Sequence, residues 1–544
     1  MKTVNLILFS DSKETPEWSL GKVFPCSPQT EAINSILDEN LQSESVDAWL
    51  FWDPDMGIPD HNMLMELLET SADCWHAGLA LGLGGEPEMI DFISPTWMLN
   101  RDPDPSLEAT SWRLSLRACL IRSDVLRQLG GPRSEFESLE AAGLELGLRY
   151  IRQGAFVRYV PGFVGEQKPI SDAKISLNDQ LLFVRYSFGS RWAGWAIFRA
   201  ALTRFASLFS LIRSWQRVRK LPKSIYPASC QRDKTLAIQP VDGRVTVLIP
   251  TLRRYPYLQV LLDQLRWQTV APFEIIVVDQ TPLGERNLEM KYEFSDLPLR
   301  WFFLDQAGQC SSRNFGLQTA RSEYILFLDD DDEIQPDLIE RHLTNLSRYR
   351  INISNGVAIE PKAGDLPEEF RILRVSNVFP TNNTMIRRDL LQKSGLFDLA
   401  YDHGQRADHD LGMRLYLTGE LMVLDPDISV IHHHAPVGGL REHKARVDTY
   451  AASRKRLFKQ ILPSVSDIYL SKRYFSEKQV REKCWIDILG TFSVKGSVPK
   501  RFLKGLIALL SMPRNIYLVK QRIKIADQMF EQFPRIPRLS QEDH

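Results

Sequence analysis

The chain has 544 residues, of which 44% are hydrophobic and 25% are charged, and its net charge is −1. This composition is that of a globular protein, and the length is enough for two or three domains with their own cores. Six cysteines are scattered without paired spacing, which argues against a disulfide framework or a cysteine-based zinc site and favours a reducing cytosol.

The chain opens with MKTVNLILFSDSKE, in which the apolar run is too short for the core of a signal peptide. We therefore predict a β-strand there. No uncharged apolar stretch approaches the roughly 20 residues that span a bilayer. These features favour a cytoplasmic protein.

The pattern of the sequence divides the chain into four segments. Residues 1–185 mix strand and helix patterns, and residues 186–240 combine a basic amphipathic stretch with a polar linker. Residues 241–440 alternate strands and helices, and residues 441–544 are mostly helical. We predict an α/β fold with a helical C-terminal region.

Positive charge is concentrated in two of these segments. Residues 191–223 hold eight Lys and Arg and no acidic residue, and residues 444–524 hold 19 Lys and Arg against five acidic residues. Trp and Phe are interleaved with this charge, so the helices could lie in the interface of an anionic membrane. Alternatively they pack between domains, with Arg stems lying along apolar surface. Nucleic acid binding is disfavoured because no recognition motif accompanies the charge.

The third segment is the most regular. RVTVLIPT, EIIVVDQT and EYILFLDDDDE read as buried strands, and helical patterns separate them. Strands that alternate with helices predict a parallel, doubly wound sheet, whose ligands bind at the carboxyl ends of the strands. Thr251, Asp279 and the acidic turn at residues 329–333 lie at such ends.

The acidic turn places five acidic side chains in a row directly after a strand. Their mutual repulsion favours a bound cation, and hard oxygen ligands suit Mg²⁺ or Mn²⁺, which commonly bridge carboxylates to substrate phosphates. A solvated acidic loop is the alternative. Its position at the edge of a doubly wound sheet favours the metal site.

Four motifs in order give this segment a family resemblance. They are PTLRR at residues 250–254, VVDQT at residues 277–281, the block GQCSSRNFGLQTARSEYILFLDDDD at residues 308–332, and RADHDLGMRLYLTG at residues 406–419. Residues 244–434 therefore resemble the family 2 glycosyltransferases, which have the GT-A fold. The resemblance implies a nucleoside-diphosphate sugar as donor and a metal-dependent, inverting transfer.

The resemblance also implies roles for individual residues. Pro250, Thr251 and Asp279 would hold the nucleotide base, Asp330 would lie near its ribose, and the basic side chains of Arg254 and Arg313 would lie near the nucleotide. Gln280 stands where the family usually has a second Asp, which leaves the identity of the nucleotide open. The alternative for Asp279 is a helix N-cap.

Asp408 matches the residue that acts as catalytic base in the family. A carboxylate there could take the proton of an acceptor hydroxyl. Ala407 stands where the family usually has Glu, and Asp410 is a nearby alternative base. An N-cap of the following helix is the structural alternative for Asp408.

Asp329 and Asp331 form the D-x-D of the family's metal site, which the family often completes with a histidine. His432, His433 and His434 follow the strand DISVI, and side chains two apart in a strand share a face. We predict His432 as the metal ligand and His434 as the second candidate. A surface cluster is the alternative.

The first segment contains a second copy of the same pattern. Aligned at a constant offset of 265, residues 121–161 and residues 386–426 are identical at 11 of 41 positions. In this alignment Gly143 stands opposite Asp408, and residues 167–169 stand opposite the three histidines. AWLFWDPD keeps a D-x-D at Asp53 and Asp55. We predict two tandem GT-A-like domains, the first degenerate, with a second active site as the alternative.

The four segments are therefore predicted to be a degenerate domain, a basic helix with a linker, a catalytic domain, and a basic helical region. The acceptor would be a glycan or a lipid-linked molecule in surface glycan or polysaccharide synthesis, reached at the inner face of the plasma membrane. The rival hypothesis is a non-catalytic scaffold that binds glycans or nucleotide sugars. A metal phosphatase is disfavoured because the acidic turn lacks the nucleophile pattern.

Overall fold

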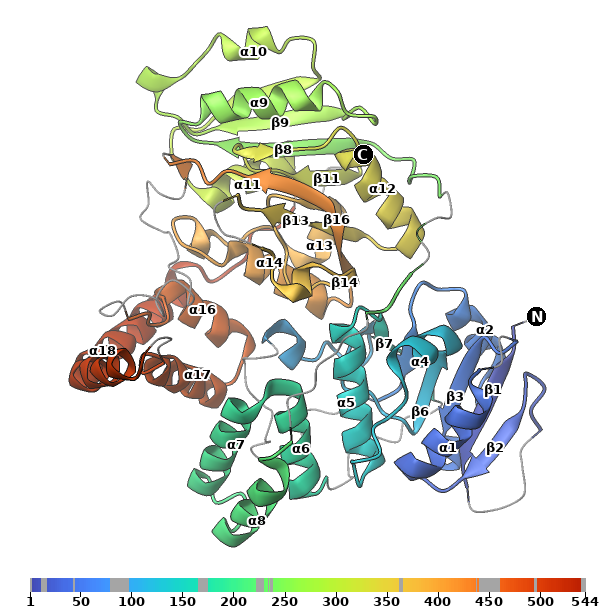
Figure 1. Cartoon of the computed structure of the whole chain (residues 1–544). Helices are drawn as coiled ribbons and strands as arrows, with labels where there is room; N and C mark the ends of the chain where they lie inside the picture. The colour runs from blue at the N-terminus through green and yellow to red at the C-terminus, as the bar shows by residue number, and fades with distance from the viewer. Residues whose placement is uncertain are drawn as a thin grey trace.

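A computed structural model describes the chain except for a set of short segments, about which nothing is said below. These are residues 1, 11–16, 43–44, 79–96, 165–174, 222–228, 233, 235–237, 362–364, 437, 440–459, 494–496 and 540–544. The described part contains two β-sheets, each covered by helices, and two groups of further helices (Figure 1). The boundary predicted at residue 440 and the positions opposite the three histidines, residues 167–169, lie outside the described residues.

The first sheet lies within residues 1–185, here called the first domain. Its strands are β1 (Val4–Phe9), β2 (Val23–Cys26), β3 (Ala48–Trp52), β4 (Cys74–His76), β5 (Ala109–Thr110), β6 (Ala118–Arg122) and β7 (Val157–Tyr159). The helices around it are α1 (Thr30–Asn40), α2 (His61–Leu68), α4 (Ser123–Leu129) and α5 (Leu139–Arg152). The strand order is β2-β1-β3-β6-β4-β7-β5.

The second sheet lies within residues 241–440, here called the second domain. Its strands are β8 (Val245–Thr251), β9 (Glu274–Asp279), β10 (Leu299–Phe303), β11 (Tyr324–Phe327), β12 (Asp332–Glu333), β13 (Ile353–Ile359), β14 (Arg374–Val375), β15 (Thr384–Arg387) and β16 (Met422–His432). The helices are α9 (Tyr255–Leu265), α10 (Met290–Glu293), α11 (Gln309–Thr319), α12 (Leu338–Tyr349), α13 (Leu390–Ser394) and α14 (Ala407–Leu417). The order is β10-β9-β8-β11-β15-β13-β16-β12, and β14 pairs with β16.

The two sheets have the same topology. Without β10 and β12, the second sheet reads β9-β8-β11-β15-β13-β16-β14, which matches the first strand for strand, including which pairs are parallel. The register agrees as well: Ala109 pairs with Tyr159, and Arg374 pairs with Leu424, so both partners are shifted by 265 residues. The prediction of an α/β fold with two tandem copies is confirmed.

A buried arginine repeats its contacts in both copies. Arg149 donates to Glu145 and to the carbonyl groups of residues 129 and 131, and Arg414 donates to Asp410 and to those of residues 394 and 396. Every partner is again shifted by 265 residues. The identity of Arg149 and Arg414 in the alignment is therefore explained by packing, since each arginine ties its long helix to the turn that precedes it.

The two domains pack against each other through equivalent surfaces. A Cβ atom at Gly154 would overlap the carbonyl oxygen of Leu373, and one at Gly419 would overlap that of Glu108. Both glycines have φ near +90°, where other residues are strained. Since Gly154 corresponds to Gly419 and Glu108 to Leu373, the contact has approximate two-fold symmetry, like the interface of a homodimer.

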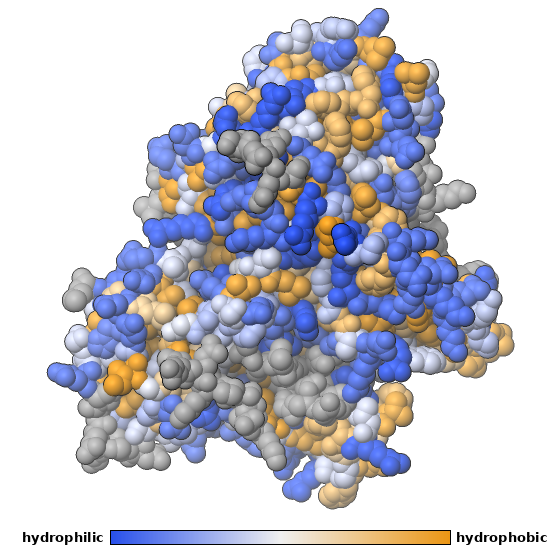
Figure 2. All heavy atoms as spheres, turned by 180° about the vertical axis from the view of Figure 1, so that it is seen from behind, coloured by the Kyte–Doolittle hydropathy of each residue, from blue (hydrophilic) through white to orange (hydrophobic). Residues whose placement is uncertain are grey.

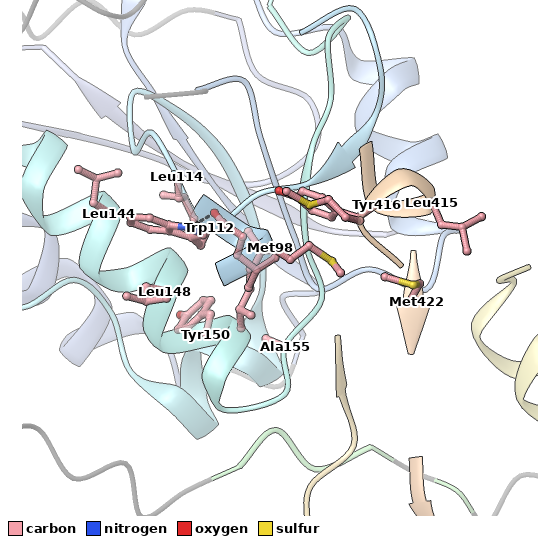
Figure 3. Packing of buried hydrophobic residues seen from close by; sticks show 14 of the residues in the cluster. Met98, Trp112, Leu114, Leu144, Leu148, Tyr150, Ala155, Leu415, Tyr416 and Met422 are labelled. Carbon is pink, nitrogen blue, oxygen red and sulfur yellow. Dashed lines mark hydrogen bonds between the residues drawn. The ribbon is translucent and has the colours of Figure 1, made fainter. Parts of the chain in front are cut away.

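The hydrophobic core runs through this contact without a break. Figure 3 shows Met98, Trp112 and Tyr150 of the first domain in the same cluster as Tyr416 and Met422 of the second. Tyr416 also donates a hydrogen bond of 2.7 Å to the carbonyl group of Arg101. Burial of this apolar surface holds the domains together.

Among the described residues, two further groups of helices begin, one near the end of each domain. They are α6 (Leu177–Phe188), α7 (Ser190–Leu202), α8 (Leu208–Val218), α16 (Val465–Tyr474), α17 (Glu477–Gly490) and α18 (Val498–Gln532), and the two groups lie at the lower end of Figure 1. The start predicted for the basic segment, residue 186, falls inside α6.

The inner face of α7 joins the two groups of helices. Arg199 is buried and forms a 3.0 Å ion pair with Glu482 of α17, to which Trp195 also donates. This part of the basic segment therefore packs against other helices, which agrees with interdomain packing and not with a membrane interface.

Of the described helices, α18 is long and apolar enough to cross a bilayer by length and composition, although its sequence contains no uncharged apolar stretch of that length. Its most apolar 18-residue window has a mean hydropathy of 1.3 and is 22% buried. One such helix is weak support for a membrane span, because the helix of a soluble protein can meet the same criteria.

Candidate active site

Three parallel strands bring the predicted site residues to one edge of the second sheet. β8 lies between β9 and β11 and is parallel to both, so their carboxyl ends meet there. Thr251 pairs with Asp279 across the β8–β9 register, and the acidic turn follows β11. Thr251 donates a 2.8 Å hydrogen bond to Asp330, which links the two ends of this edge.

Asp279 lies beneath the surface of this edge. Its side chain is fully buried, and it accepts hydrogen bonds from Tyr255 at 2.8 Å, from the Trp301 indole at 3.3 Å and from the Thr281 amide at 2.9 Å. It does not cap a helix, since Pro282 is the N-cap of the short helix that follows. In this arrangement Asp279 fixes the position of two aromatic side chains, and its predicted contact with a nucleotide base would need them to move.

Two arginines neutralise the acidic turn. Arg254 lies between two carboxylates, 2.9 Å from Asp330 and 3.1 Å from Asp331, and Arg313 lies 2.7 Å from Asp329. Both guanidinium groups are mostly buried. They are placed where an anionic group at the strand ends would meet positive charge.

Asp329, Asp331 and His432 form a cluster that could hold a metal ion. Their ligand atoms all lie within 4.8 Å of one another. The cluster forms because β12 pairs antiparallel with β16, with Asp332 opposite His432. The last residue of β16 is thereby carried to the acidic turn, 100 residues earlier in the chain.

The three histidines have different carboxylate partners, although the rings of His432 and His434 lie 4.3 Å apart, edge to face. His432 Nδ1 lies 2.9 Å from Asp332 and 3.7 Å from Asp331, whereas His433 contacts Glu333 at 2.6 Å. His434, the second predicted ligand, lies 2.8 Å from Glu360 instead. Only His432 belongs to the described metal cluster.

The acidic turn favours positive charge. Burial raises the pKa of Asp330 to about 6 and also raises the pKa of Asp332. Burial lowers the pKa of His432, but hydrogen bonding to Asp332 and the surrounding carboxylates outweigh it and raise the pKa to about 9. Carboxylate oxygen and imidazole nitrogen are ligands that Mn²⁺ and Mg²⁺ accept, so the residues fit a divalent cation.

Asp408 lies in the first turn of α14 and does not cap it. The N-cap is Arg406, with φ of 82°, and no side chain caps this end. The Asp408 side chain is 39% exposed, and its carboxylate lies 3.0 Å from Nδ1 of His409. Burial raises the pKa of Asp408, but His409 and then Arg406 lower it more strongly, to about 2. The group is therefore a carboxylate at neutral pH.

Asp410, the alternative base, is committed to the core. It is fully buried, pairs with Arg414 and accepts a 2.7 Å hydrogen bond from Tyr474 of α16. Its counterpart in the first domain, Glu145, has the same relation to Arg149. The repeated contact assigns Asp410 to packing.

Comparison with known proteins identifies the segment that carries the acidic turn. Residues 246–403 match the profile of "Glycosyl transferase family 2". The matched segment is a family 2 glycosyltransferase domain. The profile ends before Asp408 and His432, which follow it in the same sheet and helix layer.

Curated relatives resemble only part of the chain. Glycosyltransferase GlyA of Streptococcus pneumoniae is 32% identical over 118 residues, which are 21% of this chain and 17% of that protein. The uncharacterized glycosyltransferase YwdF of Bacillus subtilis is 28% identical over 168 residues, 28% of this chain and 62% of that protein. The chain thus covers less than two thirds of the length of either relative.

Two solved structures show the extent of the structural likeness. S. aureus TarS 1-349 in complex with UDP-GlcNAc has a TM-score of 0.35 at 16% identity and covers 53% of this chain and 92% of its own. Mannosyltransferase PcManGT from Pyrobaculum calidifontis, in complex with GDP-Man and Mn²⁺, has a TM-score of 0.36 at 18% identity and covers 63% of this chain and 97% of its own.

The sheet of the first domain has the same topology as that of the glycosyltransferase domain, but different residues lie at the carboxyl ends of its strands. Arg117 forms an ion pair with Asp53, the first Asp of its D-x-D, and also binds Glu140 at 2.9 Å, while Asp55 is exposed. At Gly143, opposite Asp408, a Cβ atom would lie 2.6 Å from the carbonyl oxygen of Leu114. Backbone therefore fills the position of the base, in agreement with the prediction of a degenerate copy.

Several residues of the site have no signal in the sequence. Tyr255 and Trp301 come from α9 and β10 and meet only at Asp279. Asp402 accepts hydrogen bonds of 2.8 Å from the amides of Cys310 and Ser311 and so fixes the first turn of α11. Asp402 had no signal either, because it lies 92 residues from Cys310 and meets α11 only in the folded domain.

Proposed function

We propose that the chain is an inverting, metal-dependent glycosyltransferase that moves a sugar from a nucleoside-diphosphate sugar to an acceptor hydroxyl. The observation that carries the proposal is the cluster of Asp329, Asp331 and His432 at the strand ends of a family 2 domain. His432 lies close to two carboxylates, those of Asp332 and Asp331.

The residues at the strand ends would have separate roles in binding the metal ion and the nucleotide. Asp329, Asp331 and His432 would hold Mg²⁺ or Mn²⁺, which supplies charge neutralisation for the leaving diphosphate. Arg254 and Arg313 add fixed positive charge beside it. Pro250 and Thr251 would shape the nucleotide pocket, and Asp279 would hold Tyr255 and Trp301 as its aromatic walls.

Asp408 would act as the base. As a carboxylate at neutral pH it can accept the proton of the acceptor hydroxyl while that oxygen bonds to the anomeric carbon and the bond to the diphosphate breaks. Attack from the face opposite the leaving group inverts the configuration. The partial exposure of Asp408 leaves room for an acceptor.

A thermal-shift screen tests the proposal directly. UDP, GDP, CDP and dTDP would each be added with and without Mn²⁺, since a bound ligand stabilises the fold by mass action. We expect one nucleotide to raise the melting temperature only when Mn²⁺ is present. A rise that is the same without metal, or with every nucleotide, would favour the rival hypothesis of a scaffold with no metal-dependent donor site.

We further propose that the enzyme acts at an anionic membrane surface on a lipid-linked or surface glycan acceptor. The outer face of α8 leaves Leu208, Phe209 and Ile212 between 57% and 75% exposed, in a stretch without acidic residues. Figure 2 shows hydrophobic side chains within the hydrophilic surface at the lowest part of the molecule, where α8 lies.

Helix α18 has a similar outer face. It buries Lys504 and Asn515, whereas Phe502, Leu509 and Leu510 are 57% to 76% exposed. A helix of a water-soluble surface normally has the reverse pattern. Apolar side chains flanked by Lys and Arg are suited to the interface of anionic lipid, which attracts each basic residue by about 1 kcal/mol.

A further inference from the structure

The proposed base is held by a chain of hydrogen bonds that leaves the glycosyltransferase domain. His409 Nδ1 lies 3.0 Å from Asp408, Arg406 Nη1 lies 3.2 Å from His409 Nε2, and Arg406 Nε donates at 2.6 Å to Asp467 of α16. Asp467 is in turn fixed by its capping box with Ser464. The position of the Asp408 carboxylate therefore depends on a helix of the C-terminal region.

The direction of these hydrogen bonds sets the tautomer of His409. An Arg N–H group can only donate, so Nε2 accepts and the ring proton lies on Nδ1. That proton is donated to Oδ1 of Asp408. Among the described residues no other side chain hydrogen-bonds to this carboxylate, which leaves its second oxygen for the acceptor hydroxyl.

The first domain also contributes a side chain beside His409. The indole of Trp97 lies 5.9 Å from the His409 ring and 5.9 Å from Phe475, centroid to centroid. Trp97 begins the short helix η2 (Trp97–Asn100), whose next residue, Met98, packs on α14 near Gly412. Since η2 is seated in the domain interface, the indole is presented to His409 by the contact of the two domains.

Trp97 carries two signs of constraint. Its φ is 45°, a conformation that costs energy for a bulky residue. Its indole Nε1 is buried and has no hydrogen-bond partner among the described residues. Both costs persist only where the surroundings fix the residue, and such residues cluster at functional sites.

We propose that Trp97 is a positioning residue for Asp408, and that the first domain thereby completes the active site of the second. Trp97 contacts both the His409 ring and Phe475, and the His409 ring holds the carboxylate. The inference rests on the proposed function, because it assigns Asp408 the role of base. It gives the degenerate domain a task that needs none of its own site residues.

The test compares variants of the full chain. In Trp97→Ala we expect kcat to fall about 10-fold or more, since a displaced catalytic group is costly, while metal-dependent binding of the nucleoside diphosphate stays within about twofold. In Trp97→Phe we expect most of the activity. The matched control is Trp18→Ala, because Trp18 also contacts a histidine, His61, at 4.7 Å but lies on the far side of the first domain.

The pH profile separates positioning from packing. The hydrogen bond from His409 favours the charged form of Asp408, so its loss raises the pKa of the carboxyl group. The acid limb of the kcat profile should therefore move to higher pH in Trp97→Ala and in His409→Ala. It should stay in place in Trp18→Ala.

The outcomes are distinct. An unchanged kcat and acid limb in Trp97→Ala would overturn the inference, as would an equal loss of kcat, nucleotide binding and melting temperature. If the wild-type chain bound no donor and showed no transfer, the proposed function would fail instead. NMR of the His409 ring then decides: we expect the Nδ1–H tautomer in the wild type and mixed tautomers in Trp97→Ala, and identical spectra would refute the role of Trp97.

Discussion

His432 and His434 are two residues apart, yet only one of them faces the acidic turn. The alternation of side chains along a strand predicts a shared face for both. Strand β16 ends at His432, however, and His434 has φ of 53°, so its side chain contacts the His432 ring but pairs with Glu360 and not with the acidic turn. The strand position could be predicted from the sequence, whereas the point at which the strand ends depends on its pairing with β12.

This difference gives the first prediction. His432→Ala should weaken metal-dependent binding of the nucleoside diphosphate at least about 10-fold, because a ligand of the cation is lost. His434→Ala should change it clearly less, since His434 pairs with Glu360 and only packs against the ring of His432. Isothermal titration with the nucleotide found in the thermal-shift screen, at a fixed Mn²⁺ concentration, measures both. Equal losses in the two variants would contradict the assignment.

Asp408 and Asp410 give the second prediction, because they separate catalysis from stability. Asp408→Asn should lower kcat about 10²-fold or more with an unchanged melting temperature. Asp410→Ala should lower the free energy of unfolding by about 3 kcal/mol or more, since it leaves the buried Arg414 without its carboxylate. Turnover and denaturant unfolding of the same preparations provide the comparison. A stable, inactive Asp410→Ala would make that residue the base.

The site could be predicted in part from individual residues of the sequence. Positions at strand ends indicated the acidic turn, and Asp329, Asp331 and His432 do meet. The partners of Asp279 were not predictable, because Tyr255 and Trp301 belong to no motif and approach it only in the folded sheet. The tie between Asp408 and α16 was hidden for the same reason, since Asp467 lies 61 residues beyond Arg406.

At the scale of elements, the two alternatives for the basic segment apply to different helices: α7 fits interdomain packing, and α8 fits a membrane interface. Arg199 on α7 packs inward against Glu482, whereas the outer face of α8 exposes Leu208 and Phe209. The sequence shows the amphipathic pattern of both helices, but it cannot show which faces are covered by α17. The adjacent helix, and not the composition, decides what each face does.

The third prediction tests the outer face of α8. Phe209→Glu should reduce co-sedimentation with anionic vesicles several-fold at low salt, because it removes apolar insertion and adds repulsion. Trp267→Glu is the matched control, since Trp267 is also 75% exposed but lies outside the basic segments. High salt should weaken binding of the wild type. Binding that is equal for neutral and anionic vesicles, or absent from both, would leave these helices as interdomain packing.

For the whole molecule, the sequence predicted the duplication because packing residues repeat at a fixed offset. The offset of 265 extends in the structure to the β5 and β14 pairings, beyond the aligned block. The strands β10 and β12 of the second sheet have no counterpart among the described strands of the first. Their absence there could not be predicted, because short edge strands carry little pattern of their own.

The fourth prediction concerns the division of labour between the domains. Asp53→Ala combined with Asp55→Ala should leave turnover within about twofold of the wild type, since Arg117 occupies the first carboxylate and the second is exposed. Asp329→Ala combined with Asp331→Ala, the equivalent pair, should abolish turnover. Steady-state assays of both double variants make the comparison. Loss of activity in the Asp53 and Asp55 double variant would mean that the active site lies in the first domain.

The two-fold contact around Gly154 and Gly419 joins surfaces within one polypeptide. In a pair of separate chains, such a contact dissociates on dilution, and any residue that one partner lends to the other is lost with it. Covalent linkage replaces that concentration dependence with a fixed, high effective concentration of the partner. Specific activity of this protein should therefore remain constant across dilutions that would separate two independent chains.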